Sequence, residues 1–419
     1  MTTTVEAVPS LRHIVAGSSS SATQQASLEM SLPPAQPAYI LRGHAAPIHS
    51  TTFIRSNSRL VSGDSEGWIV VWSLEIKRPV AVWKAHEGAI LGADSWGSDK
   101  LITHGKDNKL IVWKYSEEDE PSLSTILPVD HTAELRKQPW LLHILEVNTM
   151  NFCSFAQCEV EPTGSENSSY QELLIAVPNT MGSETVDIFR LPSCERIHTV
   201  PAPKPIQGGM VMTVSLTHHP TDRTLTVITG YENGHTAVTS LTSSKGWQTT
   251  YISQAHAQPV LSLSLSPERD YYLTSAADDI IAKHPIPRPT LTGTAHSVET
   301  LPIKTIQTKH SGQQGLKIRN DGKIFATAGW DARVRVYSCK GMKELAVLKW
   351  HKEGCYAVAF ADVEDEIATE GSESSEQGGT LVHRLGELNV KEERIRIAKR
   401  AHWLAAGSKD GKISLWIIY

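Results

Sequence analysis

Four sets of a histidine, a hydroxyl residue and an acid recur along the chain, and these side-chain types together could perform triad-type nucleophilic catalysis. From each histidine, a Ser or Thr follows at 17 or 18 residues, an acid at 21 or 22, and a ring at 27 or 28. The sets are His44/Ser62/Glu66/Trp72, His86/Thr103/Asp107/Trp113, His256/Thr274/Asp278/His284 and His310/Thr327/Asp331/Tyr337. A catalytic triad should occur once and line a pocket, so the repetition favours a structural role.

In that structural role, the acid, the histidine, the hydroxyl and the ring would form one buried hydrogen-bond chain, because buried polar groups need partners. A degraded fifth set contains His351, Asp410 and Trp416, with Ala406 where a Ser or Thr is expected. Glu66 in place of Asp is a second departure. The chain also lacks HExxH, GxSxG, GxGxxG and EF-hand motifs. We therefore expect no catalytic residue, no cofactor and no metal site.

The residues between these sets have the pattern of β-strands. From residue 37 onward, short runs of Val, Ile, Leu and Trp alternate with turn clusters of Gly, Asp, Asn and Ser. The two clearest segments begin at His44 and His86, which are 42 residues apart. Their length and spacing resemble the WD40 repeat, a four-stranded propeller blade. The usual Asp after the last Trp is missing, so the prediction of an all-β WD40 propeller rests on the spacing.

Seven blades account for residues 37–419. The four clear blades lie at 42–76, 84–115, 254–286 and 308–338. Two weaker blades are predicted from strands at Leu141–Phe155, Glu172–Val177 and Thr185–Leu191, and from Thr224–Leu241. The last blade begins at Leu345 and resumes at Ala401, after an insertion of about residues 364–400. This insertion either carries binding specificity, as long insertions in repeat folds often do, or is a loop with no role.

The two ends of the repeat region predict a closed ring. The final run Trp416–Tyr419 aligns with the third strand of the other blades, and Ala38–Leu41 stands where a fourth strand belongs. Pairing these two segments would remove the exposed edges of an open array. Residues 1–36 are rich in Ser, Thr, Ala, Pro and Gln and are predicted to be a disordered tail.

Composition narrows the class of protein. The net charge of −5 and the charged fraction of 20% argue against direct binding to nucleic acid or to anionic membranes. Five Cys without a CxxC pair fit a reducing compartment. No apolar run is long enough to cross a membrane, and the N-terminus lacks a secretory signal core. We expect a soluble intracellular protein, in which the acidic run Glu117–Glu120 is a solvated loop.

The resemblance to WD40 blades also implies which side chains meet partners. In such blades the residue before the turn acid projects onto the surface around the channel mouth. Here these residues are Ser65, Lys106, Ala277, Trp330 and Lys409. Trp330 is the main candidate, since an exposed indole is a typical interface anchor; the alternative is an indole packed under its own loops. Lys106 and Lys409 would make the mouth modestly cationic.

Residues 37–419 resemble one subgroup in particular, the ASTRA-associated WD-repeat proteins of fungi, which are related to Gβ-subunit-like proteins of animals. The resemblance is carried by the segments Leu41–His44, Asp64–Trp72, His104–Trp113, Thr327–Tyr337 and Ala405–Trp416. It implies a non-enzymatic ASTRA complex subunit in the nucleus, with the cytoplasm as a second location, linked to chromatin remodelling. The implied partners are PI3-kinase-like kinases, the co-chaperones that mature them, and RuvB-like AAA ATPases.

The leading hypothesis is therefore a scaffold for protein–protein interaction. A true Gβ subunit would need an N-terminal helical heptad segment, which residues 1–36, with Pro9, Pro33 and Pro34, do not provide. A second alternative is an adaptor that binds a modified peptide, such as a histone tail, at the channel mouth. An enzyme with a propeller fold is the least favoured.

Overall fold

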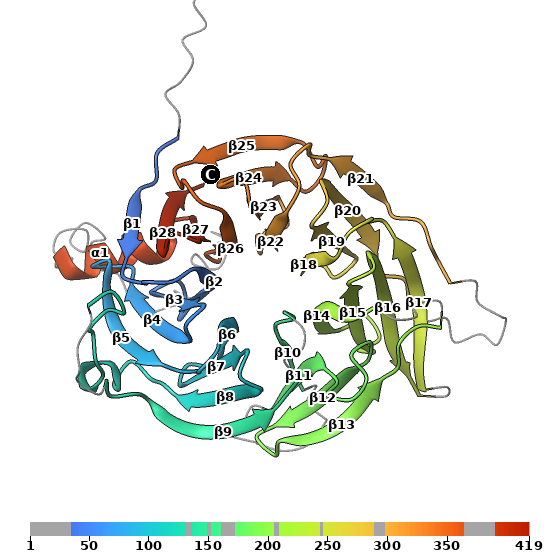
Figure 1. Ribbon diagram of the computed structural model, residues 1–419, viewed down its shortest axis with the longest axis horizontal. Coiled ribbons are helices and arrows are strands. Elements are labelled where there is room, and N and C mark those ends of the chain that lie inside the picture. Colours follow the sequence, from blue (N-terminus) through green and yellow to red (C-terminus); the bar gives the residue numbers. More distant parts are fainter. Residues whose placement is uncertain are drawn as a thin grey trace, which may run out of the picture. The chain divides into compact units, whose positions relative to one another are not determined.

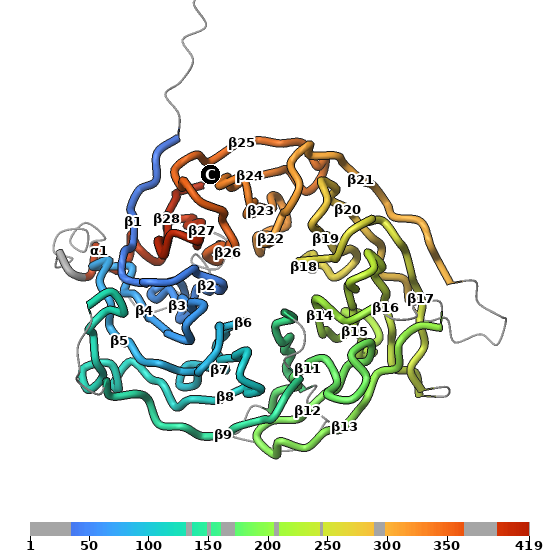
Figure 2. Tube along the Cα trace, viewed as in Figure 1, coloured from blue at the N-terminus to red at the C-terminus, as the bar shows by residue number. Residues whose placement is uncertain are grey.

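The computed structural model describes residues 35–130, 136–148, 152–160, 172–204, 209–243, 246–288, 298–363 and 390–418. The predicted tail at residues 1–36 lies outside this part of the chain, apart from residues 35 and 36. The remainder forms seven four-stranded sheets arranged in a ring, and the chain passes from blade to blade in sequence order (Figures 1 and 2). The prediction of a seven-bladed, all-β propeller is confirmed.

Each blade runs from an inner to an outer strand. The first blade consists of β2 (Ile48–Ile54), β3 (Arg59–Asp64), β4 (Trp68–Ser73) and β5 (Arg78–Lys84). The second consists of β6 (Ile90–Trp96), β7 (Lys100–Gly105), β8 (Lys109–Lys114) and β9 (Trp140–Glu146). The third consists of β10 (Ala156–Glu159), β11 (Leu173–Pro178), β12 (Val186–Leu191) and β13 (Glu195–Val200). The fourth and fifth are β14 Val211–His218, β15 Leu225–Tyr231, β16 His235–Thr242, β17 Gly246–Gln254; and β18 Val260–Leu265, β19 Tyr271–Ala276, β20 Ile280–Pro285, β21 Lys304–Gln307. The sixth and seventh are β22 Gln313–Ile318, β23 Ile324–Gly329, β24 Arg333–Ser338, β25 Glu344–Lys349; and β26 Cys355–Phe360, β27 Trp403–Ser408, β28 Lys412–Ile417, β1 Tyr39–Arg42.

The middle strands are apolar on both faces because each blade is packed between two others. Strand β4 shows this alternation. Its Ile69 and Val71 pack in one cluster with Leu101 of the second blade. Its Val70 and Trp72 pack in another, with Leu415 of the last blade. The hydrophobic core is therefore a series of layers between neighbouring blades, which holds the inner strands in fixed positions around the centre.

The ring closes as the sequence predicted, because the N-terminal strand β1 completes the last blade. Strand β1 pairs antiparallel with β28, and Leu41 lies opposite Ile413. Both side chains are buried in the layer shared by the first and last blades. The closing strand therefore contributes main-chain hydrogen bonds and apolar contacts together.

The predicted third blade was wrong at its start. Residues from Leu141 onward form β9, the outer strand of the second blade, and the third blade begins only at β10. The cause is a long excursion between β8 and β9 that returns to the first blade. There the Ser124 carbonyl accepts a 2.7 Å hydrogen bond from Val82 N–H, and the Gly43 carbonyl accepts one of 3.0 Å from Val129 N–H. The strands predicted within Thr224–Leu241 are confirmed as β15 and β16.

The acidic run at 117–120 was also wrongly predicted to be solvated throughout. It contains a short 3-10 helix, η1 Glu120–Ser122, and the Glu120 carboxylate is buried. That carboxylate accepts hydrogen bonds from Arg55 at 2.7 Å, Arg59 at 2.8 Å and the Tyr115 hydroxyl at 2.7 Å. Three charge-assisted or hydroxyl donors compensate for the cost of burying one carboxylate. The run thus anchors the excursion to the first blade.

Of the predicted insertion at 364–400, residues 364–389 lie outside the described chain. Residues Val390–Arg400 form α1, a helix that the repeat spacing did not predict. Ala398 is buried in the layer between the first and last blades, and the Trp403 indole N–H donates a 2.8 Å hydrogen bond to its carbonyl. The helix is thereby tied to the start of β27. No helix in the described ranges is long and apolar enough to span a membrane.

Candidate functional site

The polar set of the second blade forms the continuous hydrogen-bond chain that the spacing suggested. His86 Nδ1 lies 2.9 Å from Asp107 Oδ1, and Nε2 lies 2.8 Å from Thr103 Oγ1. The Trp113 indole donates to the same hydroxyl at 2.8 Å. A carboxylate only accepts, so His86 Nδ1 carries a proton and donates it to Asp107. Burial alone would raise the pKa of Asp107, but the His86 hydrogen bond and charge lower it below its ordinary value.

The set of the fifth blade has the same order and extends further. His256 lies 3.1 Å from Asp278 and 2.8 Å from the Thr274 hydroxyl. That hydroxyl is 2.9 Å from His284 Nε2, and His284 Nδ1 is 2.8 Å from the Tyr251 hydroxyl of β17. Burial, followed by the nearby His256, lowers the pKa of His284 to about 3, so this ring is neutral. His284 therefore replaces the usual Trp and links two blades.

In the first blade the acid is Asp64, and the assignment of Glu66 is corrected. His44 is 2.7 Å from Asp64 and 2.7 Å from the Ser62 hydroxyl, to which the Trp72 indole donates at 2.9 Å. Asp64 aligns with Gly105 of the second blade, where a Cβ would collide with the His86 ring and Asp107. A carboxylate can thus reach this point from either position.

In the sixth blade an arginine takes the place predicted for His310. The His310 ring is 43% exposed and lies 3.7 Å from Asp331, and it forms no hydrogen bond with Thr327. Arg335, whose side chain is buried, instead holds the Asp331 carboxylate with two nitrogens, at 2.6 and 3.2 Å. Two-point guanidinium–carboxylate pairing is stronger than a single imidazole bond, which explains the exchange. Tyr337 is buried at the predicted ring position.

In the last blade the missing hydroxyl comes from the third strand. Ser414 lies opposite Ala406 in the β27–β28 register. Its hydroxyl is 2.9 Å from His351 Nε2 and accepts a 2.9 Å hydrogen bond from the Trp416 indole. His351 Nδ1 lies 3.4 Å from Asp410. Burial opposes ionisation of Asp410, but the bond and charge of His351 prevail and lower its pKa to about 2.

In the first, second and fifth blades the histidines of these sets are sealed inside the layers between blades. The side chains of His44, His86 and His256 have no exposed surface. A substrate cannot reach imidazoles in such positions, so their geometry supports the blades and not catalysis. Among the described residues, no group of three or more His, Cys, Asp or Glu is placed to hold a metal ion.

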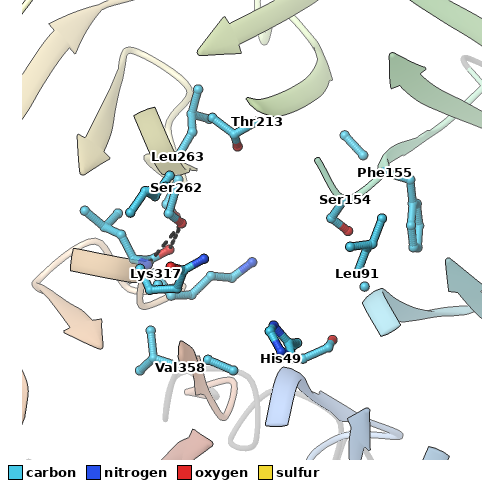
Figure 3. A pocket seen from close by; sticks show the side chains of 18 of the residues that line it. His49, Leu91, Ser154, Phe155, Thr213, Ser262, Leu263, Lys317 and Val358 are labelled. Carbon is cyan, nitrogen blue, oxygen red and sulfur yellow. Dashed lines mark hydrogen bonds between the residues drawn. The ribbon is translucent and has the colours of Figure 1, made fainter. Parts of the chain in front are cut away.

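A different set of residues surrounds the accessible space at the centre of the ring. The first strands of all seven blades line a cavity of about 830 Å³ (Figure 3). Its wall is mainly hydroxyl and aliphatic, with residues such as Thr51, Ser262 and Leu263. Asp94 and Lys317 are the acidic and the basic residue of this wall, and burial raises the pKa of Asp94. This wall is suited to peptide groups better than to a highly charged ligand.

The end of the cavity where the first strands begin carries aromatic side chains, and we call it the channel mouth: His49, Phe152, Trp330 and Tyr356. All four line the cavity. The His49 and Tyr356 ring centres are 5.4 Å apart. Burial, the largest effect, lowers the pKa of His49, so this ring is neutral near pH 7. The mouth therefore presents four rings around one opening.

Trp330 packs against its own loop and is also exposed, and its role as an interface anchor stays a prediction. Its indole N–H donates a 2.9 Å hydrogen bond to Gln314 Oε1, and 47% of the residue surface is exposed. Gly312 has a φ of +79° and lies under the ring, where a Cβ would overlap the indole. Only glycine combines that backbone conformation with such close approach. The indole of Trp330 is therefore held in place against Gly312, and its exposed surface is available to a partner.

The two predicted lysines differ in their relation to the mouth. Lys106 Nζ lies 3.6 Å from the centre of the Phe152 ring, a cation–π contact next to the cavity. Lys409 is exposed and lies 4.0 Å from Glu353, and it does not line the cavity. Phe152 itself was missed, because it precedes β10 in the stretch that the sequence assigned to a strand. Phe152 could have been recognised as an aromatic residue in the loop that precedes the first strand of a blade.

Known proteins match the chain over almost its full length. A family model described as ASTRA-associated protein 1 matches residues 37–416. A protein of that name from Verticillium alfalfae is 53% identical over 387 residues, covering 91% of this chain and 93% of its own length. Those from Pyricularia oryzae and Schizosaccharomyces pombe are 47% and 33% identical, covering 92% and 79% of this chain and 98% and 95% of their own lengths.

Proposed function

The chain belongs to the ASTRA-associated protein 1 family, and from this membership we propose that it is a non-catalytic interaction scaffold within the ASTRA complex. The shared name of the relatives supports assembly with that complex. The closed propeller supports a scaffold role, because its blades hold loop residues in fixed positions around one opening. The observation that carries the proposal is the half-exposed, clamped indole of Trp330.

Such a ring is well suited to bind another protein. Side chains that dominate binding energy are usually large aromatic or arginine residues that meet a partner with little loss of their own freedom. Trp330 meets this condition through Gly312 and Gln314. Phe152, which is 60% exposed, adds a second aromatic surface at the same mouth. A partner loop that places apolar side chains against these two rings would bury both.

We propose as its partners a PI3-kinase-like kinase, the co-chaperones that mature it, and RuvB-like AAA ATPases. Through them the protein would take part in kinase maturation and in chromatin remodelling, in the nucleus. This finer assignment is supported by the resemblance of the chain to ASTRA-associated WD-repeat proteins. The mouth supplies a surface on which one of these partners can be held.

The test is purification of the tagged chain from its own cells, followed by quantitative mass spectrometry. Co-purification of RuvB-like ATPases and a PI3-kinase-like kinase in near-constant ratio to the tagged chain is expected. Recovery of neither class, from a preparation in which the propeller is folded, would contradict the ASTRA assignment. Nuclear and cytoplasmic fractions, purified separately, test the location.

A second candidate function is binding of a modified peptide at the same mouth. It is favoured by the Lys106–Phe152 contact, which shows that this aromatic face already accepts an ammonium group. A methylated lysine of a histone tail would have to displace Lys106 and reach Trp330 or Tyr356. Anisotropy titration with methylated and unmethylated histone peptides distinguishes the two functions, because the scaffold predicts no preference for methylation.

A further inference from the structure

The outer strand β9 presents an apolar surface far from the channel mouth, on the rim of the ring (Figure 1). Trp140, Leu141 and Ile144 are 76, 38 and 46% exposed. No other strand of the described chain has as many exposed large apolar residues. Exposed apolar residues scattered singly are ordinary, whereas three on one strand mark an interaction surface.

The edge of β9 is also open within the described chain. This strand is the last of its sheet, in the order β6-β7-β8-β9, so only one of its edges pairs with another strand. Uncovered, apolar strand edges are a hazard that proteins usually avoid, because they pair with other chains. An open edge of seven residues, five of them apolar, therefore needs an explanation.

The fold covers two other outer strands with extended chain. Along β5, the Ser124 carbonyl accepts a 2.7 Å hydrogen bond from Val82 N–H. Along β17, Glu299 runs parallel, accepts from Ile252 N–H at 2.9 Å and donates to the Thr250 carbonyl at 3.2 Å. Extended segments laid on an outer strand are thus part of this architecture. The described residues provide no such segment for β9.

Charge indicates what kind of segment would fit. Lys114 lies directly opposite Trp140 in the β8–β9 register, and Lys137 precedes Trp140 by three residues. Both lysines are exposed, and Lys114 contributes, after hydrogen bonds from Ser116, to the lowered pKa of Asp119. The Trp140 end of the strand therefore carries two lysines, while the Ile144 end terminates at the exposed acid Glu146. We call Lys114, Lys137, Trp140, Leu141 and Ile144 the β9 patch.

We propose that the β9 patch binds an extended, apolar segment of another protein, with an acidic residue near Trp140, as a fifth strand of the second blade. Main-chain hydrogen bonds to the open edge supply affinity. Side chains on one face of the segment contact Trp140, and those on the other face contact Leu141 and Ile144, because the register places these residues on opposite faces of the sheet. The acidic residue pairs with Lys114 and Lys137. This surface is separate from the channel mouth, so it would allow the scaffold to hold two partners at once.

The probe is a library of random ten-residue peptides displayed on phage and selected on the folded full-length chain. A subsequent selection removes peptides that also bind the Trp140→Ser chain. We expect enrichment of alternating apolar sequences with an acid at one end, and amide hydrogen exchange that slows in β9 when a selected peptide binds. Absence of enrichment over the Trp140→Ser chain, or protection confined to other strands, overturns the proposal.

Affinity measurements on a selected peptide then test each part of the proposal. Trp140→Ser and Ile144→Ser should each weaken binding by about tenfold or more, as loss of an interface anchor does. Leu345→Ser on β25 is the matched control, since Leu345 is also exposed on an outer strand, and should change little. Methylating alternate peptide nitrogens should abolish binding, because strand pairing needs those donors. Equal binding of the methylated peptide would contradict strand pairing. Burial of the β9 patch by self-association of the wild-type chain would contradict binding of a segment from another protein.

Discussion

Asn57 of the first blade and Asp362 of the last hold each other by two hydrogen bonds. Asn57 Nδ2 donates to the Asp362 carbonyl at 2.7 Å, and the Asp362 N–H donates to Asn57 Oδ1 at 2.9 Å. The same Asn57 amide reaches the Lys399 carbonyl of α1 at 3.0 Å. Asn57 and Asp362 each follow the first strand of their blade, so they lie at the end of the ring opposite the mouth. The ring is therefore closed twice, by β1 at its rim and by Asn57 near its axis.

Asn57→Gly should lower the free energy of unfolding by about 1–3 kcal/mol, because it removes three partly buried hydrogen bonds, with the Asp362 carbonyl, the Asp362 N–H and the Lys399 carbonyl. Asn57 has a φ of +63°, a conformation that glycine adopts freely, so the substitution removes the side chain without straining the backbone. Urea unfolding measures the effect. Lys309→Gly is the matched control, with the same φ of +63° and an exposed side chain, and should be neutral or slightly stabilising.

The corrected acid of the first blade gives a paired test. Asp64→Ala leaves the buried Nδ1 of His44 and the N–H groups of Glu66 and Trp68 without their acceptor, and should cost about 1–3 kcal/mol. Glu66→Ala, two residues away, should change stability by less than about 0.5 kcal/mol. The midpoints of chemical unfolding compare the two. The reverse order of effects would restore Glu66 as the structural acid.

Much of the fold followed from spacing, and its departures have local causes. Residue types recur at fixed intervals because every blade buries the same positions, so the number of blades was predictable. The place of β9 was not, since the excursion anchored by Glu120 separates it from β8. The role of Asp64 was missed because a carboxylate at the end of the strand reaches the histidine of the blade as well as one in the turn does. The pairing of Arg335 with Asp331 could not be predicted, because the sequence does not show whether Arg335 or His310 binds that acid.

The candidate site was predictable only in part. Trp330 could be placed because its position is fixed relative to the turn acid Asp331. Phe152 and Tyr356 could not, since they stand before or at the start of first strands, where no repeated spacing marks which residues face the channel. Their convergence depends on the ring being closed, and closure is a property of the whole fold.

Acid should destabilise the protein well above the pH at which carboxylates are protonated. Burial lowers the pKa of His104 to about 3, and neither of its ring nitrogens has a hydrogen-bond partner among the described residues. Below pH 6.5 the unfolded chain binds a proton that the folded chain rejects. Stability should therefore fall as the pH decreases from about 6.5 toward 3, with up to about 1.4 kcal/mol per pH unit from this group.

The variant that isolates this effect is His104→Leu. Its free energy of unfolding should decline less between pH 7 and pH 5 than that of the wild-type chain. Urea unfolding at several pH values in one buffer series provides the comparison. His143→Leu, at a partly buried site on β9, is the control for the removal of a histidine as such. Parallel pH profiles for wild type and His104→Leu would show that the folded chain binds the His104 proton as readily as the unfolded chain does, and would contradict the prediction.

Closure by β1 predicts a sharp limit for truncation. A chain without residues 1–36 should keep a cooperative thermal transition, because β1 begins at Tyr39. A chain without residues 1–42 should lose it or melt far lower, since Leu41 leaves a buried layer and β28 becomes an open edge. Circular dichroism during heating measures both. A stable, cooperative chain beginning at residue 43 would show that β1 is dispensable for the ring.

The central claim is that the clamped, half-exposed indole of Trp330 holds a protein partner, and paired measurements on Trp330→Ala test it most directly. Ile76→Ser, an exposed apolar residue away from the mouth, is the control. Recovery of an ASTRA partner with the tagged chain should fall about tenfold or more for Trp330→Ala, with an unchanged melting temperature and full recovery for Ile76→Ser. Undiminished recovery, or a fall matched by a loss of stability, would contradict the account.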